Sequence, residues 1–211
     1  MAKKPFAVKG INVTSPKGKA AWCKIKEPDY EYDDKGTLST KLVVHPDDPG
    51  VAEFIEKLEE LRDIALAETK ETLGAKGNKY QPYPVFTMEE DQNEEETGNI
   101  VFNFKLKSVE ERAEKGWQHT ITVVDAKRQR VKDEDVPLIG NDSIIRCVAY
   151  ANPYSSPKDK VVGISLIWSK MQLIELVEYD GAGADDFEDE DGFSSNESDA
   201  GNEFDNEEDD F

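Results

Sequence analysis

Acidic residues crowd the end of this 211-residue chain and limit how much of it can fold. Residues 180–211 contain fifteen Asp or Glu residues and no Lys or Arg. They hold fifteen of the twenty net negative charges, because residues 1–179 carry 31 acidic and 26 basic residues. Like charges repel and few apolar side chains offset the ordering entropy, which predicts a disordered tail. We therefore expect one folded domain over 1–179 and a disordered acidic tail over 180–211.

The two ends of the chain have opposite charge. Residues 1–26 carry seven lysines and no acidic residue, whereas phenylalanines interrupt the acidic tail as far as Phe211. An acidic peptide can imitate a nucleic-acid backbone. The charges therefore predict that the tail competes with nucleic acid for a basic surface of the protein.

Composition argues against several classes of protein. No stretch approaches the ~20 apolar residues that cross a bilayer, and the first residues lack the apolar segment of a secretory signal. We therefore expect a cytoplasmic protein without membrane contact. Cys23 and Cys147 have no Cys or His at metal-ligand spacing, which predicts two buried thiols and no metal or cofactor.

Alternating apolar and polar residues predict a mostly β domain. The pattern covers about 19–27, 37–45, 99–108, 117–125, 143–151 and 160–178, and the last run is long enough for two strands broken near Ser169 and Lys170. Apolar residues spaced by three and four from Val51 predict one amphipathic helix of about six turns between the second and third strands. Asp48 is placed to cap this helix.

Basic and aromatic side chains share the strand faces that point away from the core. Successive side chains of a strand alternate between faces, so Trp22 shares a face with lysines and lies opposite Ala21, Cys23 and Ile25. Trp168 shares its parity with apolar residues and is predicted to lie in the core. The residues that we assign to nucleic-acid binding are Lys4, Trp22, Lys24, Lys26, Lys105, Lys107, Arg146, Tyr150, Tyr154 and Lys158.

Interleaved cations and aromatic rings are typical of proteins that bind single-stranded nucleic acid. Lysine and arginine attract phosphates, and each unpaired base that stacks on an aromatic ring contributes roughly 1–3 kcal/mol. The predicted helix carries seven acidic and three basic residues over 51–73, which disfavours insertion into a major groove. A loop over 76–84 also combines Tyr80 and Tyr83 with lysines and is a further place where DNA could bind.

Two other functions are compatible with parts of the sequence. The total charge of −20 would suit an acidic chaperone or DNA mimic that binds basic proteins, although the basic first 26 residues argue against it. A metal-dependent nuclease would need carboxylates, and the compact group in the body is Asp125, Asp133, Glu134 and Asp135. Basic residues surround this group, which indicates a solvated hairpin connection and no metal site.

Several short motifs occur in one order along the chain. They are Pro28-Asp29-Tyr30, Phe102-Asn103-Phe104-Lys105, Val123-Val124-Asp125, Glu134-Asp135-Val136-Pro137-Leu138-Ile139-Gly140, Pro153-Tyr154 and Asp209-Asp210-Phe211. In these motifs the chain resembles the replicative single-stranded DNA-binding proteins of T-seven-like bacteriophages. The resemblance implies an OB-fold, a five-stranded β-barrel with an extra helix, and a homodimer in the cytoplasm of the infected bacterial host.

The same resemblance implies roles for particular residues. Lys3, Lys105 and Tyr154 match positions that line the DNA groove of the family. Asp209, Asp210 and Phe211 match a terminus that recruits the phage DNA polymerase and helicase-primase. The family coats single-stranded DNA without sequence specificity in replication, recombination and repair, promotes strand annealing and is not enzymatic. Ser155 and Ser156 stand where relatives can carry Lys and Trp, so the groove would rely more on other aromatic residues.

Overall fold

A computed structural model describes residues 4–31, 34–110 and 117–178. The chain divides into two units, Met1–Tyr179 and Asp180–Phe211. The second unit lies outside the described residues, and so do the predicted binding residues Lys3, Asp209, Asp210 and Phe211.

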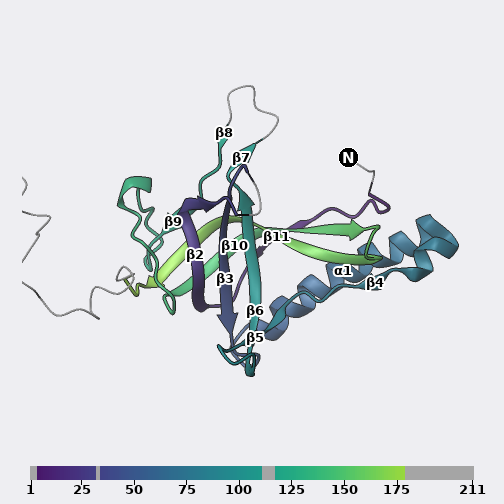
Figure 1. Cartoon of the computed structure of the whole chain (residues 1–211), viewed down its shortest axis with the longest axis horizontal. Helices are drawn as coiled ribbons and strands as arrows, with labels where there is room; N and C mark the ends of the chain where they lie inside the picture. The colour runs from purple at the N-terminus through teal and green to yellow at the C-terminus, as the bar shows by residue number, and fades with distance from the viewer. Residues whose placement is uncertain (1–3, 32–33, 111–116, 179–211) are drawn as a thin grey trace, which may run out of the picture. The chain divides into compact units, whose positions relative to one another are not determined.

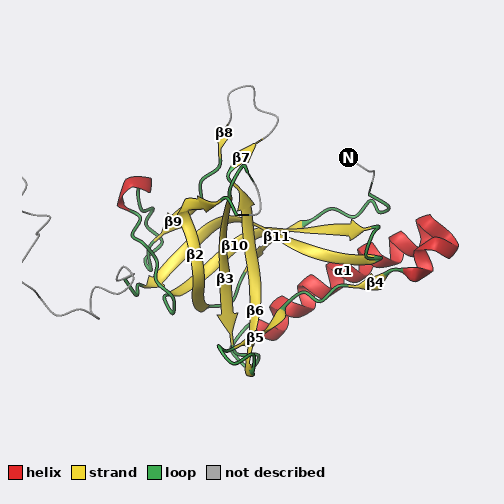
Figure 2. Ribbon diagram, viewed as in Figure 1, coloured by secondary structure: helices red, strands yellow, loops and turns green. Residues whose placement is uncertain are grey.

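Five strands pair in a closed ring, as the family resemblance implies (Figures 1 and 2). They are β2 (Gly18–Asp29), β3 (Thr37–Val44), β6 (Glu96–Lys107), β11 (Val161–Glu175) and β10 (Ile144–Ser156). Around the ring β2 pairs with β3, β3 with β6, β6 with β11, β11 with β10, and β10 with β2. The β6–β11 pairing is parallel and the other four are antiparallel. This is the five-stranded Greek-key barrel of an OB-fold.

Short strands extend the ring at several places. β1 (Ile11–Thr14) pairs with β10, β5 (Thr87–Glu90) with β6, and both β4 (Gln81–Pro82) and β9 (Thr122–Val124) run parallel to β11. β7 (Val109–Glu110) pairs with β8 (Trp117–Gln118). The strand predicted over 117–125 is therefore two short strands, β8 and β9, with different partners. The 3-10 helices are η1 (Gly74–Lys79) and η2 (Asp133–Asp135).

The barrel interior is filled by residues that alternate along the long strands. Phe102 and Phe104 of β6, Leu42 of β3 and Trp168 of β11 are fully buried, which confirms the prediction for Trp168. Its indole Nε1 donates a hydrogen bond to the carbonyl oxygen of Lys170 at 3.1 Å. Burial of one such side chain is worth about 1.5–3 kcal/mol, so this interior is a main source of stability.

The predicted break of the last strand is a β-bulge within one continuous strand. Ala149 pairs with Trp168 and Val148 pairs with Lys170, so Ser169 is the extra residue. The Ser169 hydroxyl donates a hydrogen bond to the Val148 carbonyl oxygen at 3.0 Å. A bulge bends the strand without ending it, which is why the change in alternation near Ser169 resembles a break.

A second bulge lies at Trp22. Because of it, the prediction that Ala21 shares a face with Cys23 and Ile25 is wrong. Ala21 pairs with Lys41, but Lys24 pairs with Ser39, so β2 has one residue more than β3 between these pairs. Trp22 takes a φ of 52°, in the left-handed region that bulky side chains rarely adopt. The bulge reverses the alternation, so Ala20 is buried before it and Ala21 is not.

The predicted helix is present as α1 (Val51–Leu73), but its cap is not the predicted one. Gly50, with a φ of 82°, is the N-cap residue and provides no side chain. The Asp48 carboxylate instead accepts a hydrogen bond from the His45 backbone N–H at 3.0 Å. Asp48 therefore stabilises the turn before the helix.

Helix α1 packs against two separate clusters of apolar residues. In its first half, the ring of Phe54 meets the ring of Phe102 edge-on, with 5.0 Å between the ring centroids. In its second half, Ala65 and Leu66 pack in a cluster with Phe6, Tyr80 and Val162. The helix thus lies along the barrel and along the part of β10 and β11 that runs beyond it (Figure 1).

Both cysteines are free thiols, as predicted. Cys147 is buried and Cys23 is partly buried. Burial raises the pKa of Cys23 to about 11 and also raises the pKa of Cys147. Both thiols are therefore protonated at neutral pH, which suits a role in packing.

Candidate nucleic-acid interface

A groove of about 630 Å³ lies where β6, β10 and β11 meet the segment leading into β5. We call it the tyrosine groove. Its polar and aromatic lining includes Tyr83, Asn103, Lys105, Asn152 and Tyr154, and its apolar lining includes Ile164 and Leu166. The groove therefore combines two aromatic rings, a cation and two amide groups.

Tyr154 is held at this groove by a glycine on the neighbouring strand. Tyr154 of β10 pairs with Gly163 of β11. A Cβ atom on Gly163 would lie 2.7 Å from both Cζ and the hydroxyl oxygen of Tyr154, so only glycine leaves room for the ring in this position. Burial, followed by the proximity of Tyr83 and Asp159, raises the pKa of Tyr154. The phenol is thus neutral at physiological pH.

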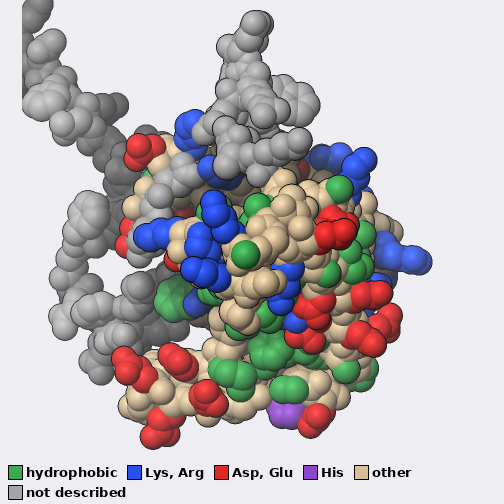
Figure 3. Space-filling model, turned by 90° about the vertical axis from the view of Figure 1, so that its right-hand side faces the viewer, with side chains coloured by type: hydrophobic (Ala, Val, Ile, Leu, Met, Phe, Trp, Pro, Cys, Tyr) green, Lys and Arg blue, Asp and Glu red, His purple; other side chains and the backbone are tan. Residues whose placement is uncertain are grey.

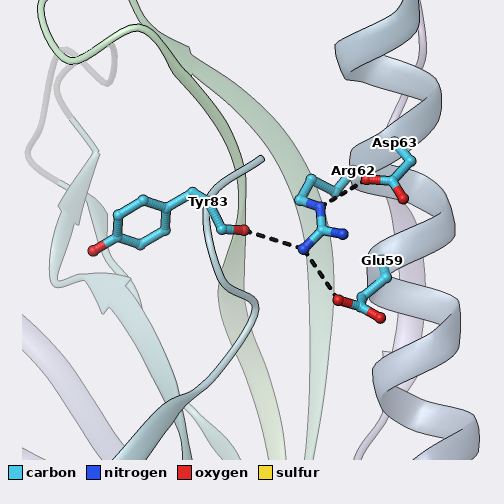
Figure 4. A network of polar contacts seen from close by, with 4 residues as sticks. All are labelled: Glu59, Arg62, Asp63 and Tyr83. Carbon is cyan, nitrogen blue, oxygen red and sulfur yellow. Dashed lines mark hydrogen bonds and ion pairs between the residues drawn. The ribbon is translucent and has the colours of Figure 1, made fainter. Parts of the chain in front are cut away.

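Tyr83 reaches the groove from a segment whose backbone is anchored on both sides. Its backbone N–H donates to the Val162 carbonyl oxygen at 2.7 Å. Its carbonyl oxygen accepts from Arg62 Nη1 of α1 at 3.3 Å (Figure 4). Arg62 is itself held by Glu59 at 3.2 Å and Asp63 at 2.8 Å. The backbone of Tyr83 is therefore fixed, while its side chain remains half exposed and accessible to a base.

Lysines surround the tyrosine groove. Lys4 Nζ donates hydrogen bonds to Asn152 Oδ1 at 3.1 Å and to the Pro153 carbonyl oxygen at 2.7 Å. An adjoining pocket of about 480 Å³ shares Tyr154 with the groove, and its lining includes Lys4, Lys76 and Lys160. On the end face of the molecule, Lys and Arg side chains gather beside exposed hydrophobic side chains (Figure 3).

Two more of the assigned lysines share the outer sheet face with Lys105. Across the sheet, Lys24 pairs with Ser39, and Ser39 pairs with Lys105. Two residues further along β3 and β6, Thr37 pairs with Lys107. Lys24 Nζ bonds the Asp29 carboxylate at 2.7 Å, which partly neutralises this end of the face. Lys26 of β2 and Lys158 in the turn after β10 are exposed and do not line the groove.

The remaining assigned residues lie in other places. Trp22 is 67% exposed, and its backbone N–H donates to Asn141 Oδ1 at 2.9 Å. The ring of Tyr150 lies against Gly10, where a Cβ atom would come within 2.7 Å of it. Arg146 lines a different pocket, together with Lys17 and Lys19. The structure therefore brings Lys4, Lys105 and Tyr154 together but distributes the other assigned residues over several surfaces.

Sequence reasoning missed several lining residues. Tyr83 lies in the Lys- and Tyr-rich loop that the composition marks, but it was not assigned to the site. Asn103 and Asn152 follow the same strand parity as Lys105 and Tyr154, which is the signal that would have found them. Arg62 has no such signal, because 21 residues separate it from Tyr83.

Comparison with known proteins agrees with this geometry. The family model described as "Single-stranded DNA-binding protein, Bacteriophage T7" matches residues 17–178. The chain belongs to this family of phage single-stranded DNA-binding proteins. The Escherichia phage T7 single-stranded DNA-binding protein is 27% identical over 207 residues, covering 90% of this chain and 83% of the relative. The Enterobacteria phage T3 protein of the same name is 23% identical over 200 residues, covering 89% and 83%.

A solved structure of a phage single-stranded DNA-binding protein has the same fold as this chain. The crystal structure of the single-stranded DNA-binding protein encoded by bacteriophage T7 superimposes with a TM-score of 0.68 at 24% identity. The match covers 88% of this chain and 99% of that chain. The predicted family and fold class are both confirmed.

Family membership also excludes the enzymatic alternative, since these proteins bind and do not catalyse. Of the four carboxylates that a nuclease would need, Asp125 lies in a turn, where its Oδ1 accepts a hydrogen bond from the Gln129 N–H at 2.8 Å, and the other three form η2. Within residues 4–31, 34–110 and 117–178, no cluster of three or more His, Cys, Asp or Glu residues could hold a metal ion. In the same part of the chain, no helix has the length and apolarity to span a membrane.

Proposed function

We propose that the tyrosine groove binds single-stranded DNA without regard to sequence. The observation that carries this proposal is that Tyr83 and Tyr154, from separate elements, line one groove with Lys105. Unpaired bases of any kind stack on such rings, at roughly 1–3 kcal/mol for each base. Lys105 and Lys4 lie where phosphates between stacked bases would pass.

The helix supports single-stranded over duplex binding. A shallow surface of α1 is lined by Glu56, Glu59, Glu60 and Asp63, so the exposed side of this helix repels phosphates. A major groove requires a basic or polar element that can enter it. The barrel and its groove therefore remain as the DNA-binding part of the described chain.

The test compares Tyr154→Ala with Tyr30→Ala in a binding titration. Tyr30 is also exposed, but it does not line the tyrosine groove. We expect Tyr154→Ala to weaken binding of labelled oligo-dT roughly 5- to 150-fold, the equivalent of one lost stack, and Tyr30→Ala to leave it unchanged. Equal affinities for both variants would place the DNA elsewhere.

We also infer roles in phage DNA replication, recombination and repair, with annealing of complementary strands. The family membership supports these roles. By resemblance, Asp209, Asp210 and Phe211 would recruit the phage DNA polymerase and helicase-primase, and the protein would act as a homodimer in the host cytoplasm.

Phe211→Ala should abolish polymerase capture without changing oligo-dT affinity, and analytical ultracentrifugation should give twice the chain mass. Retained polymerase capture, or a sedimenting monomer, would contradict the respective inference.

The acidic chaperone that the net charge of −20 suggests is disfavoured by the family membership. It predicts tight binding of cationic proteins and no affinity for oligo-dT. The same oligo-dT titration therefore separates the two functions.

A further inference from the structure

A second cationic pocket lies at the other end of β10 from the tyrosine groove. It measures about 640 Å³, and its lining includes Lys17, Lys19, Val43, His45, Ile144 and Arg146. We propose that this pocket, centred on Arg146 and Lys17, is a second site that binds a phosphodiester of single-stranded DNA. The proposal rests on the DNA-binding function proposed above and extends it to a separate surface.

Arg146 is the main reason for this proposal. Its Nε atom is buried and has no hydrogen-bond partner among the described residues. A buried donor without a partner is costly, at about 1–3 kcal/mol, so most such donors in proteins are satisfied. The planar guanidinium presents several donors in a fork that matches phosphate oxygens. An anion in the pocket would provide the partner that the protein itself does not.

The acidic residues near this pocket are directed to other groups. Asp142 bonds Lys19 at 2.8 Å, and Glu89 also acts on Lys19. Asp48 itself lines the pocket, and its carboxylate accepts a hydrogen bond from the backbone N–H of His45. In the described part of the chain, no carboxylate forms an ion pair with Lys17 or Arg146. These two cations are therefore the ones available to a ligand.

The pocket is too far from the tyrosine groove to share one phosphate with it. Arg146 and Tyr154 have the same strand parity on β10 and are separated by eight residues, which corresponds to about 27 Å at the usual rise of a strand. The two sites would therefore hold separate segments of nucleic acid. These segments could belong to one long strand or to two strands, and both sources present the same phosphodiester.

The apolar part of the lining favours nucleic acid over a free anion. Val43, Val44, Ile144 and Pro49 stand beside the cations, and they offer contact area for a sugar or base next to its phosphate. The family is described as binding single-stranded DNA, so this polymer is the phosphodiester that the chain would meet. An acidic peptide is the alternative ligand of this pocket, and the test distinguishes it from DNA.

The experiment measures fluorescence anisotropy with labelled oligo-dT of about 6 and about 30 nucleotides, lengths near the lower end of and well above the usual site of one OB-fold. The variants are Arg146→Gln and Lys17→Gln in the full chain. Lys17 is exposed, so Lys17→Gln should fold normally and tests the pocket even if Arg146→Gln does not fold. Arg130→Gln is the matched control, since Arg130 lies on an exposed hairpin next to Asp133.

We expect Arg146→Gln and Lys17→Gln to weaken binding of the long oligonucleotide by roughly 5- to 20-fold. Each variant should also reduce the slope of log K against log salt by about 0.7, the value for one phosphate contact on a single strand. The tight phase of short-oligonucleotide binding, which belongs to the tyrosine groove, should not change. Saturation at one long strand per protomer would indicate a single strand across both sites, whereas two per protomer would indicate two strands.

Long-oligonucleotide affinities equal to that of Arg130→Gln for both variants would overturn the second site. The second site would also be overturned if a labelled poly-Glu peptide bound the pocket and oligo-dT did not displace it, because the pocket would then be a carboxylate site. These outcomes differ from failure of the proposed function, in which Tyr154→Ala would leave even short-oligonucleotide binding unchanged.

Discussion

The ring of Tyr154 lies so close to Gly163 on the neighbouring strand that a single added methyl group would come within 2.7 Å of it. The position of a predicted base-stacking residue therefore depends on the absence of a side chain across the sheet. We therefore expect Gly163, which has no side chain, to affect DNA binding through the position of Tyr154.

Gly163→Ala should displace the Tyr154 ring from the tyrosine groove. We expect weaker binding of oligo-dT, up to the roughly 1–3 kcal/mol of one stacked base. The measurement is a double-mutant cycle with Tyr154→Ala. Because both changes remove the same contact, the double variant should bind no more weakly than Tyr154→Ala alone. Additive losses would show that Gly163 acts independently of the ring.

Arg62→Gln should release the segment that carries Tyr83. The variant loses the bond from Nη1 to the Tyr83 carbonyl oxygen and both ion pairs, so we expect a loss of roughly 1–3 kcal/mol in unfolding free energy. Oligo-dT affinity should fall severalfold because Tyr83 is no longer positioned. Urea unfolding and anisotropy give the two values, with Lys57→Gln on the same helix as control. Lower stability with unchanged affinity would remove Tyr83 from the site.

Lys105→Ala should reduce the salt dependence of DNA binding. Replacing one phosphate-contacting lysine lowers the slope of log K against log salt by about 0.7 for a single strand. Lys57→Ala is the matched control, since Lys57 lies on the exposed face of α1, outside the tyrosine groove. Titrations at four or more salt concentrations provide the slopes, and identical slopes for the two variants would contradict a phosphate contact at Lys105.

Removal of residues 180–211 should tighten DNA binding at low salt. The truncated chain keeps 31 acidic and 26 basic residues, so most of the charge that opposes phosphates is gone. The gain should fade as salt rises, because the screening length shortens from about 10 Å at 0.1 M to about 3 Å at 1 M. Titration of the full and truncated chains over a salt series tests this expectation. Unchanged affinity at every salt concentration would exclude competition by the tail.

Stability should decline in alkaline solution. Burial raises the pKa of Cys23 from 9.0 to about 11 and also raises the pKa of Cys147 and Tyr154. Between about pH 9 and 11 the unfolded chain therefore binds fewer protons than the folded one, so the free energy of unfolding falls as pH rises. Cys23 alone accounts for a loss of about 2–3 kcal/mol by the top of this range. Urea unfolding should show a shallower decline in Cys23→Ala, and a flat profile in the unaltered chain would contradict the shift.

Strand parity predicted most of the barrel, because the inward residues of β6, β10 and β11 alternate in the sequence as they do in space. It failed at Ala21, since the left-handed Trp22 adds a residue to β2 and reverses the faces. The helix was predicted from its period, but its N-cap was not, because Asp48 bonds the preceding turn and Gly50 is the N-cap residue. Such local exchanges of hydrogen-bond partners leave no periodic signal.

The site was predicted in part for a similar reason. Parity placed Lys105 and Arg146 on outward faces, and the family resemblance added Tyr154. The structure joins Lys105 and Tyr154 in one groove. Arg146 lies on the same face of β10 as Tyr154, yet the length of that strand puts it at a separate pocket. The link from Arg62 to Tyr83 depends on how the helix docks on the barrel, which residue spacing does not encode.

Helix α1 has a consequence for the speed of DNA capture. By packing against both the barrel interior and the cluster around Val162, it holds the extended ends of β10 and β11 in place in the absence of DNA. A groove formed in advance loses little conformational entropy when a strand enters. Association should then be a single bimolecular step governed by diffusion and charge, with no slower phase of protein rearrangement.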